Sequence, residues 1–196
     1  MNKFKSIFLG ILFLSTGFAV HAEGDSKIGG VRVGYHTSAL YNGDESLYET
    51  NRLDNFYLGV YKNFKIIPLL NWTAGLEYFQ NGAKSSTTVG GDYKIGYLSI
   101  PIHLRVKLGP VFALAGVAAN IKVSDSKSGI YNDPAQYGNT ESFDLPLALG
   151  IGFKFLMFSV EARYHWGTQT INTRTDIEGA TDFTTQYLQI GAAVEF

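Results

Sequence analysis

The sequence predicts an all-β protein, an eight-stranded antiparallel up-and-down transmembrane β-barrel. Three observations lead to this prediction. The chain begins like an exported protein, its hydrophobic residues alternate with period two in about eight segments, and the connections between those segments are alternately long and short. Together they favour a barrel that crosses a membrane over one that is dissolved in water.

The first 22 residues have the pattern of a cleaved signal peptide, which we assign to residues 1–22. Lys3 and Lys5 precede an apolar run from Ile7 to Val20, and the run ends in the small-x-small sequence Val20-His21-Ala22. A membrane-spanning helix needs about 20 apolar residues, so this run is too short to be one. We therefore expect export across the inner membrane followed by cleavage.

The remaining residues, 23–196, number 174 (196 minus 22) and suit a single barrel domain. The chain has no cysteine, which excludes a lipid-attachment cysteine, disulfides and cysteine-based metal sites. The net charge of −1 gives no reason to expect a nucleic-acid partner. A mean hydropathy of +0.02 is too low for a helical membrane protein but normal for a barrel, since half of its side chains face away from lipid.

Alternation is clearest in the segment that ends at Gly109-Pro110. One face carries an apolar row from Leu98 to Leu108, and the opposite face carries Ser99, His103, Arg105 and Lys107. The row covers 11 residues, in line with the roughly 9–11 that a tilted strand needs to cross a bilayer. The same pattern predicts the other seven strands, at about 28–41, 53–66, 69–80, 111–124, 143–156, 158–166 and 187–196.

The connections alternate strictly between two lengths. Short turns are predicted at Ile67-Pro68, Gly109-Pro110 and Leu156-Met157, and long polar loops at about 42–52, 81–92, 125–142 and 168–182. Bacterial outer-membrane barrels have short periplasmic turns and long external loops. We therefore expect a protein of the bacterial outer membrane with both termini in the periplasm.

Aromatic residues on the presumed lipid face fall into two groups, as the two membrane interfaces select. Tyr35, Phe56, Tyr78, Tyr164 and Trp166 lie toward the long loops, and Phe64, Trp72, Phe155, Phe158 and Phe196 toward the short turns. Three residues fit poorly. Pro101 and Pro146 lie inside strands, where each removes a ladder donor and a bulge is one way to absorb it. Lys62 on the lipid face must snorkel or mark a register shift.

The chain resembles the PorT-like outer-membrane β-barrel family at YLSIPIHLRVKLGP, at the FALAGV that follows, and at FDLPLALGIGFKF. The resemblance implies an outer-membrane barrel of about this size. It also implies that the terminal Phe196 is similar to the signal read by the barrel-assembly machinery. Some relatives are linked to a protein secretion system, but barrel architecture alone does not assign a function.

The face opposite the lipid collects charged and polar residues. An eight-stranded barrel is just wide enough inside to be filled by side chains, so we expect these residues to pair in a closed lumen. A narrow ion path is the alternative interpretation. The predicted lumen network is Arg32, Glu77, His103, Arg105, Lys107, Glu161, Arg163 and His165, and His36, Lys154 and Glu195 lie on the same face.

No catalytic, cofactor-binding or metal-binding residues are assigned. His36, His103 and His165 come from different strands without short ligand spacing, so lumen hydrogen bonding explains them better than a metal. Ser159 and His165 share a strand face with Glu161, yet a six-residue separation is about 20 Å, too far for one hydrolytic site.

We therefore predict a non-enzymatic integral outer-membrane protein with a structural role or a role in loop-mediated interaction, within a secretion or surface assembly. Its expected partners are outer-membrane lipid, the barrel-assembly machinery, and an extracellular or envelope protein bound by the long loops, with segment 125–142 as the candidate. A lipid-modifying enzyme is the first alternative. A soluble lipocalin-like barrel with inverted faces is the second.

Overall fold

The structure is a computed structural model that describes residues 29–41, 50–85, 91–128, 141–169 and 184–196. The predicted signal peptide, most of loop 42–52, and the loop residues Tyr131, Asn132, Asp133, Pro134 and Tyr137 lie outside the described residues. No helix in the described part of the chain is long and apolar enough to cross a membrane. The strands are β1 (Gly29–Tyr41), β2 (Thr50–Ile67), β3 (Leu70–Ser85), β4 (Asp92–Leu108), β5 (Val111–Lys127), β6 (Phe143–Asp144), β7 (Leu147–Phe155), β8 (Phe158–Trp166) and β9 (Thr184–Glu195).

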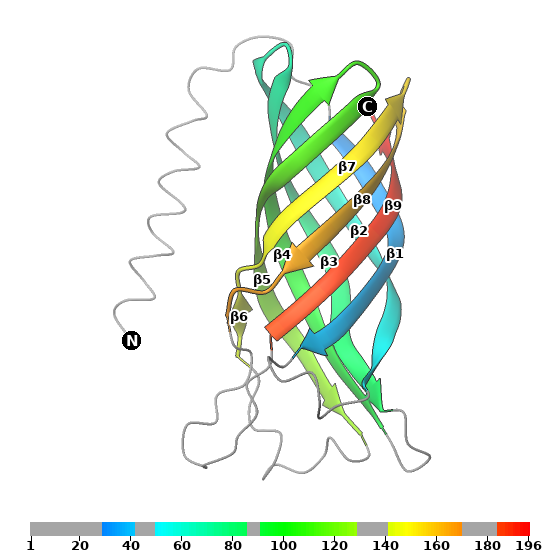
Figure 1. Cartoon of the computed structure of the whole chain (residues 1–196), viewed down its shortest axis with the longest axis vertical. Helices are drawn as coiled ribbons and strands as arrows, with labels where there is room; N and C mark the ends of the chain where they lie inside the picture. Colours follow the sequence, from blue (N-terminus) through cyan, green and yellow to red (C-terminus); the bar gives the residue numbers. More distant parts are fainter. Residues whose placement is uncertain (1–28, 42–49, 86–90, 129–140, 170–183) are drawn as a thin grey trace, which may run out of the picture.

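These strands form one closed antiparallel barrel of eight membrane strands, as predicted (Figure 1). Each strand pairs with its sequence neighbours, β1 pairs with β9, and the β4–β5 pairing completes the ring. β6 and β7 are two parts of a single strand that is interrupted at Leu145-Pro146, where a ladder bond would need the amide that proline lacks.

Neither internal proline lies at a bulge, so the interpretation that bulges absorb them is wrong. The register of β5 against β6 and β7 is the same on both sides of Pro146, since Asn120 pairs with Asp144 and Val117 with Leu147. The Pro146 carbonyl still accepts a bond of 3.0 Å from the Ala118 amide. β3 and β4 likewise keep one register across Pro101. Each proline therefore interrupts the ladder of hydrogen bonds without shifting the register of the strands.

The short connections lie at one end of the barrel, here called the turn end, and the long ones at the other, the loop end (Figure 1). The turns occupy Pro68-Leu69, Gly109-Pro110 and Leu156-Met157, so the first lies one residue later than predicted. Gly109 has a φ of +68°, which glycine adopts without strain. At the loop end β2 to β5 extend beyond their neighbours, and part of the predicted loop 81–92 is strand in β3 and β4.

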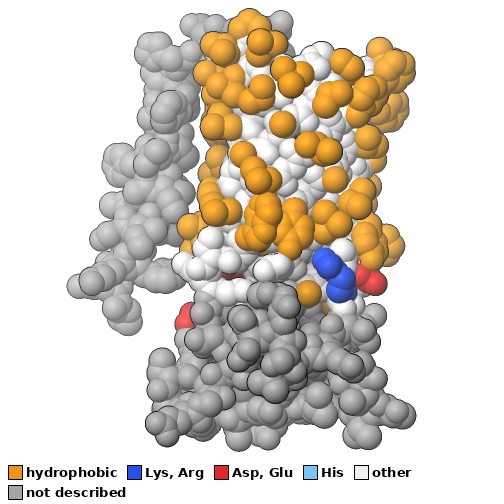
Figure 2. Space-filling view, viewed as in Figure 1, with side chains coloured by type: hydrophobic (Ala, Val, Ile, Leu, Met, Phe, Trp, Pro, Cys, Tyr) orange, Lys and Arg blue, Asp and Glu red, His pale blue; other side chains and the backbone are white. Residues whose placement is uncertain are grey.

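The strands expose their apolar face and bury their polar one. Val33, Leu104 and Ile151 are 53%, 50% and 66% exposed, whereas Arg32 and Arg163 are 1% and 0% exposed. Figure 2 shows apolar side chains over the outer wall of the barrel and a more polar surface toward the loop end. This facing suits a hydrocarbon solvent and excludes the inverted, lipocalin-like barrel, whose apolar rows would line a cavity.

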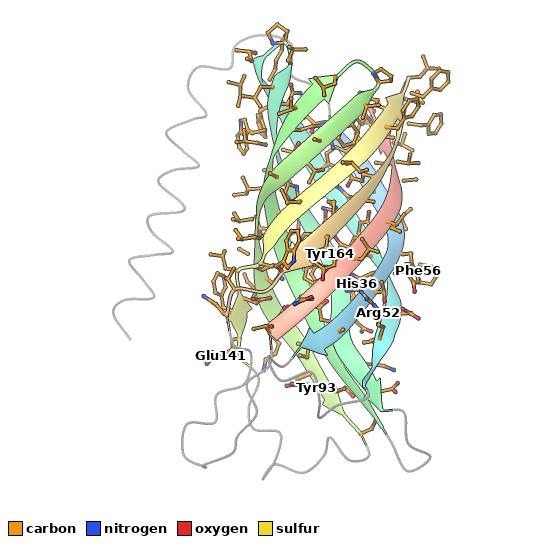
Figure 3. All side chains as sticks on the ribbon, viewed as in Figure 1. His36, Arg52, Phe56, Tyr93, Glu141 and Tyr164 are labelled. Carbon is orange, nitrogen blue, oxygen red and sulfur yellow. The ribbon has the colours of Figure 1, made fainter. Side chains whose placement is uncertain are left out.

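The aromatic residues of both predicted belts lie on the outer wall. Phe56 projects away from the barrel toward the loop end (Figure 3). Phe64 and Trp72 stack at 4.2 Å toward the turn end. Lys62 is exposed on the same wall and the β1–β2 register is unbroken there, so the register-shift explanation for this lysine is wrong.

Glycines on the lumen face make room for large side chains from neighbouring strands. Gly34 and Gly191 pair across β1 and β9, and a Cβ at Gly191 would lie 2.2 Å from the hydroxyl of Tyr57. A Cβ at Gly152 would lie 2.2 Å from the Phe112 ring. The Tyr57 and Phe112 rings therefore occupy the space that side chains at these glycines would take.

Replacing Gly191 with valine should lower the free energy of unfolding by about 1–3 kcal/mol, because the new side chain overlaps Tyr57. Urea unfolding of the protein refolded in detergent micelles measures the change. The matched control is Ala192→Val, which adds volume to the adjacent residue on the exposed outer wall and should shift stability by less than about 0.5 kcal/mol. Equal losses in both variants would contradict the role given to Gly191.

Candidate functional site

Four charged side chains near the middle of the lumen form a ring of alternating sign. Arg32 from β1 lies 2.8 Å from Glu161 of β8 and 3.3 Å from Glu77 of β3. Arg163, also from β8, lies 2.8 Å from Glu77 and 3.3 Å from Glu161. Each charge therefore has two opposite charges as neighbours, which offsets much of the desolvation that burial imposes.

The pairing of Arg163 with Glu77 is bidentate, the strongest geometry for these groups. Its Nη1 donates to Glu77 Oε1 at 2.8 Å and its Nη2 donates to Oε2 at 3.1 Å. Both side chains are almost wholly buried, with relative exposures of 0% and 2%. The pair joins β3 to β8, which do not pair with one another in the sheet.

A second group of charges extends the ring toward the turn end. Arg105 of β4 lies 3.3 Å from Glu161 and 3.2 Å from Glu195 of β9. Lys154 of β7 forms an ion pair with Glu195. Tyr61 of β2 donates a hydrogen bond of 3.0 Å to the same carboxylate, and the Arg105 guanidinium lies 4.1 Å from the centre of the Phe112 ring on β5. All eight membrane strands therefore contribute a side chain to the charged network or its direct contacts.

Lys107 lies half-buried at the turn end of the lumen. Lys154, Glu195, Arg105 and Lys65 are the charged groups that act on it electrostatically. The sequence placed Lys107 in the lumen network together with Arg105. The structure places Lys107 at the turn end of that network, beyond Arg105.

The histidines lie on the loop side of the charged ring and are not brought together into one group. The rings of His103 and His165 are 6.4 Å apart, and His165 stacks on Tyr187 at 4.2 Å. The Nε2–H of His36 donates to Asn81 Oδ1 at 2.8 Å, and the His36 ring stacks on Phe79. Among the described residues, no group of three histidines or carboxylates has the arrangement of a metal site.

A cluster of buried, mostly aromatic residues packs inside the barrel toward the loop end, and the sequence analysis missed it. Its members come from four strands, β2, β3, β4 and β9: Tyr57, Phe79, Tyr93, Ile95, Tyr97 and Tyr187. The sequence does contain a pattern that indicates the cluster, because the apolar residues of β4 occupy the inner face up to Tyr97 and the outer face from Leu98 onward. Inside the bilayer apolar side chains point out, and beyond it they point in.

A buried carboxylate, Asp144, lies beside this ring cluster. Its Oδ2 accepts a hydrogen bond of 2.8 Å from the Thr185 hydroxyl, and Asn120 is its partner in the ladder. On the outer face of the same strand, Phe143 and Leu145 are half-buried and Leu147 is exposed, so Asp144 lies at the loop-end edge of the apolar wall.

The residues weighed for hydrolytic chemistry are separated. Ser159 is 2% exposed and pairs with Lys154 and Ala193 in the ladder, at the turn end of β8. His165 lies near the opposite end of the same strand, against Tyr187. The strand geometry keeps these two side chains about 20 Å apart.

The terminal Phe196 lies at the turn end with its side chain 75% exposed. Its backbone amide donates to the Gly29 carbonyl at 2.8 Å, and the Gly29 amide donates to the Phe196 carbonyl at 3.0 Å. These two bonds close the barrel between the beginning of β1 and the end of β9.

Comparison with known proteins agrees with this architecture. The family model described as outer membrane protein beta-barrel domain matches residues 15–172. Among solved structures, Neisserial surface protein A has a TM-score of 0.53 at 14% identity, covering 86% of this chain and 97% of its own. Ail, the attachment invasion locus protein of Yersinia pestis, solved with the heparin analogue sucrose octasulfate, has a TM-score of 0.50 at 13% identity, covering 88% and 100%.

At these identities the two structures bear on the fold alone, and no curated protein matches the chain by sequence. The family match spans most of the chain and agrees with the closed barrel, its apolar outer wall and its charged interior. The chain therefore belongs to the outer membrane protein beta-barrel domain family, whose place is the bacterial outer membrane.

Proposed function

We propose that this protein is a non-enzymatic outer-membrane scaffold whose filled barrel presents its loop end to a protein partner, within a secretion or surface assembly. The observation that carries the proposal is that side chains paired with one another fill the lumen. Three arginines and three glutamates pair inside the barrel, and a mostly aromatic cluster packs inside it toward the loop end. A lumen filled in this way leaves the ends of the barrel as the places where a partner can bind.

The shape of the loop end supports this proposal. β2 to β5 continue past the last β1–β2 pair, Ser38 with Leu53, and past the last β5–β6 pair, Ile121 with Phe143. These four strands therefore carry paired strand structure further toward the loops than the rest of the barrel does (Figure 1). Segment 125–142, most of which lies outside the described residues, follows the longest of these projections and is our candidate for contact with a partner.

The PorT-like resemblance supports the finer assignment to a secretion assembly. The Ile-Pro sequence that carries it lies in β4, with Pro101 facing the lumen opposite Gly75 of β3. In this proposal the turn end and both termini face the periplasm, and Phe196 is read by the barrel-assembly machinery during insertion. Outer-membrane lipid surrounds the apolar wall.

The alternative of a lipid-modifying enzyme has less support. Such an enzyme needs a nucleophile and a base within hydrogen-bond reach and open to lipid. Ser159 is buried in the lumen, and the carboxylate on its strand, Glu161, is engaged by three arginines. The lumen groups are placed to hold strands together.

Replacing Arg163 with methionine should lower the free energy of unfolding by about 3–5 kcal/mol, because Glu77 and Glu161 would remain buried with fewer cations. Urea unfolding in micelles measures the loss. Lys94→Met is the matched control, since Lys94 and Asp92 are a half-exposed pair at 2.9 Å that should contribute less than about 1 kcal/mol. A loss for Arg163→Met no larger than that for the control would remove the structural role of the ring.

The partner role is tested in the bacterium by replacing residues 129–140 with a Gly-Ser segment of equal length. The variant should reach the outer membrane at the normal level and keep heat-modifiable migration, because the barrel is unchanged. Surface and secreted proteins should fall to the level of a strain that lacks the gene. The same replacement at residues 42–49 is the control. An unchanged surface and secreted proteome in the gene-deletion strain would end the proposal.

A further inference from the structure

Lys62 is a charged side chain on a wall that is otherwise built for hydrocarbon. It is exposed on the outer face of β2, and its ladder partners are Gly29 and Ala74. No carboxylate of the described residues, including the C-terminal carboxylate of Phe196, lies within ion-pair distance of the Lys62 ammonium group. Asp54, Asp92 and Asp125, the carboxylates outside the lumen on β2, β4 and β5, lie at the loop end, so within the described ranges no carboxylate compensates Lys62.

Two aromatic rings fix where the Lys62 ammonium lies. Its Nζ is 5.4 Å from the centre of the Phe64 ring, and Phe64 stacks on Trp72 at 4.2 Å with 13° between the planes. Phe64 is two residues nearer the turn at Pro68-Leu69. The lysine is therefore directed toward the headgroup zone of the turn-end leaflet, as expected of a cation that snorkels.

We propose that Lys62, Phe64 and Trp72 form a binding site for an anionic phospholipid of the turn-end leaflet. The ammonium supplies a point charge for the phosphate, and the indole N–H of tryptophan is a donor suited to the headgroup or ester oxygens. The stacked rings present a flat apolar surface to the glycerol end of the acyl chains. The site requires only that the apolar wall faces lipid. Its assignment to the periplasmic leaflet rests on the orientation proposed above.

The sequence provides its own reporters, because the chain has two tryptophans and they lie at opposite ends of the wall. Trp72 belongs to the turn-end group, and Trp166 pairs with Leu147 at the loop end of β7 and β8. In a Trp166→Phe variant only Trp72 emits. In a Trp72→Phe variant only Trp166 emits, at a distance from Lys62.

The experiment measures quenching of each tryptophan in vesicles that contain a small fraction of brominated phosphatidylglycerol or, separately, brominated phosphatidylcholine. Trp72 should associate with the anionic lipid about fivefold more strongly than with the zwitterionic one, as one lysine at a headgroup provides. Lys62→Gln should abolish that preference at Trp72 and leave quenching of Trp166 unchanged. Inorganic phosphate at millimolar concentration should not displace the lipid, since it lacks acyl chains.

Equal quenching of Trp72 by the two lipids would overturn the proposal, as would a preference that survives Lys62→Gln. Loss of the preference on adding inorganic phosphate would also overturn it, because the site would then bind a free anion. Lys62→Gln should keep heat-modifiable migration, which shows that the variant is folded. The surface and secreted proteome tests the partner role separately, so either proposal can fail alone.

Discussion

A closed barrel of eight strands holds charged side chains only if they neutralise one another, and the ring of Arg32, Glu161, Arg163 and Glu77 meets that constraint. Sheet hydrogen bonds join each strand to its neighbours alone. The ring joins strands across the barrel, as the contact between β3 and β8 illustrates. The Glu195 group extends these ties to the strands that the ring does not reach. Side-chain ion pairs and hydrogen bonds across the lumen therefore join strands that are not neighbours in the sheet.

The kind of side chain that fills the lumen changes along the barrel axis, because the barrel wall is surrounded by lipid in one part and by water in the other. Within the apolar band, polar groups must point inward, and there Arg105 and Glu161 find partners. Beyond the band water surrounds the wall, so apolar rings such as Tyr93 and Tyr97 turn inward and pack together. The same strand β4 carries both patterns, and the switch lies between Tyr97 and Leu98. A charged lumen toward the turn end and an aromatic lumen toward the loop end therefore follow from one sequence that crosses one membrane interface.

Periodicity and connection lengths were enough to predict the strand count, the closure and the facing, since the Leu98 to Leu108 row has only one favourable orientation in a bilayer. The projecting parts of β2 to β5 were missed because the sequence there was judged by its polarity, while its apolar residues had moved to the inner face. The partners of the lumen charges were not predictable. Glu77 and Arg163 are 86 residues apart, and their contact depends on the register of every strand between them. The gap at Pro146 was anticipated, but its unbroken register was not.

The central claim is the direction in which the two faces point, and adjacent alanines on β9 test it within the native protein. Ala193 is 3% exposed and faces the lumen, whereas Ala192 is exposed on the outer wall. The decisive measurement is the set of nuclear Overhauser effects between lipid acyl-chain protons and alanine methyl groups in nanodiscs. The account predicts strong effects at Ala192 and none at Ala193. Strong effects at Ala193 with none at Ala192 would contradict it.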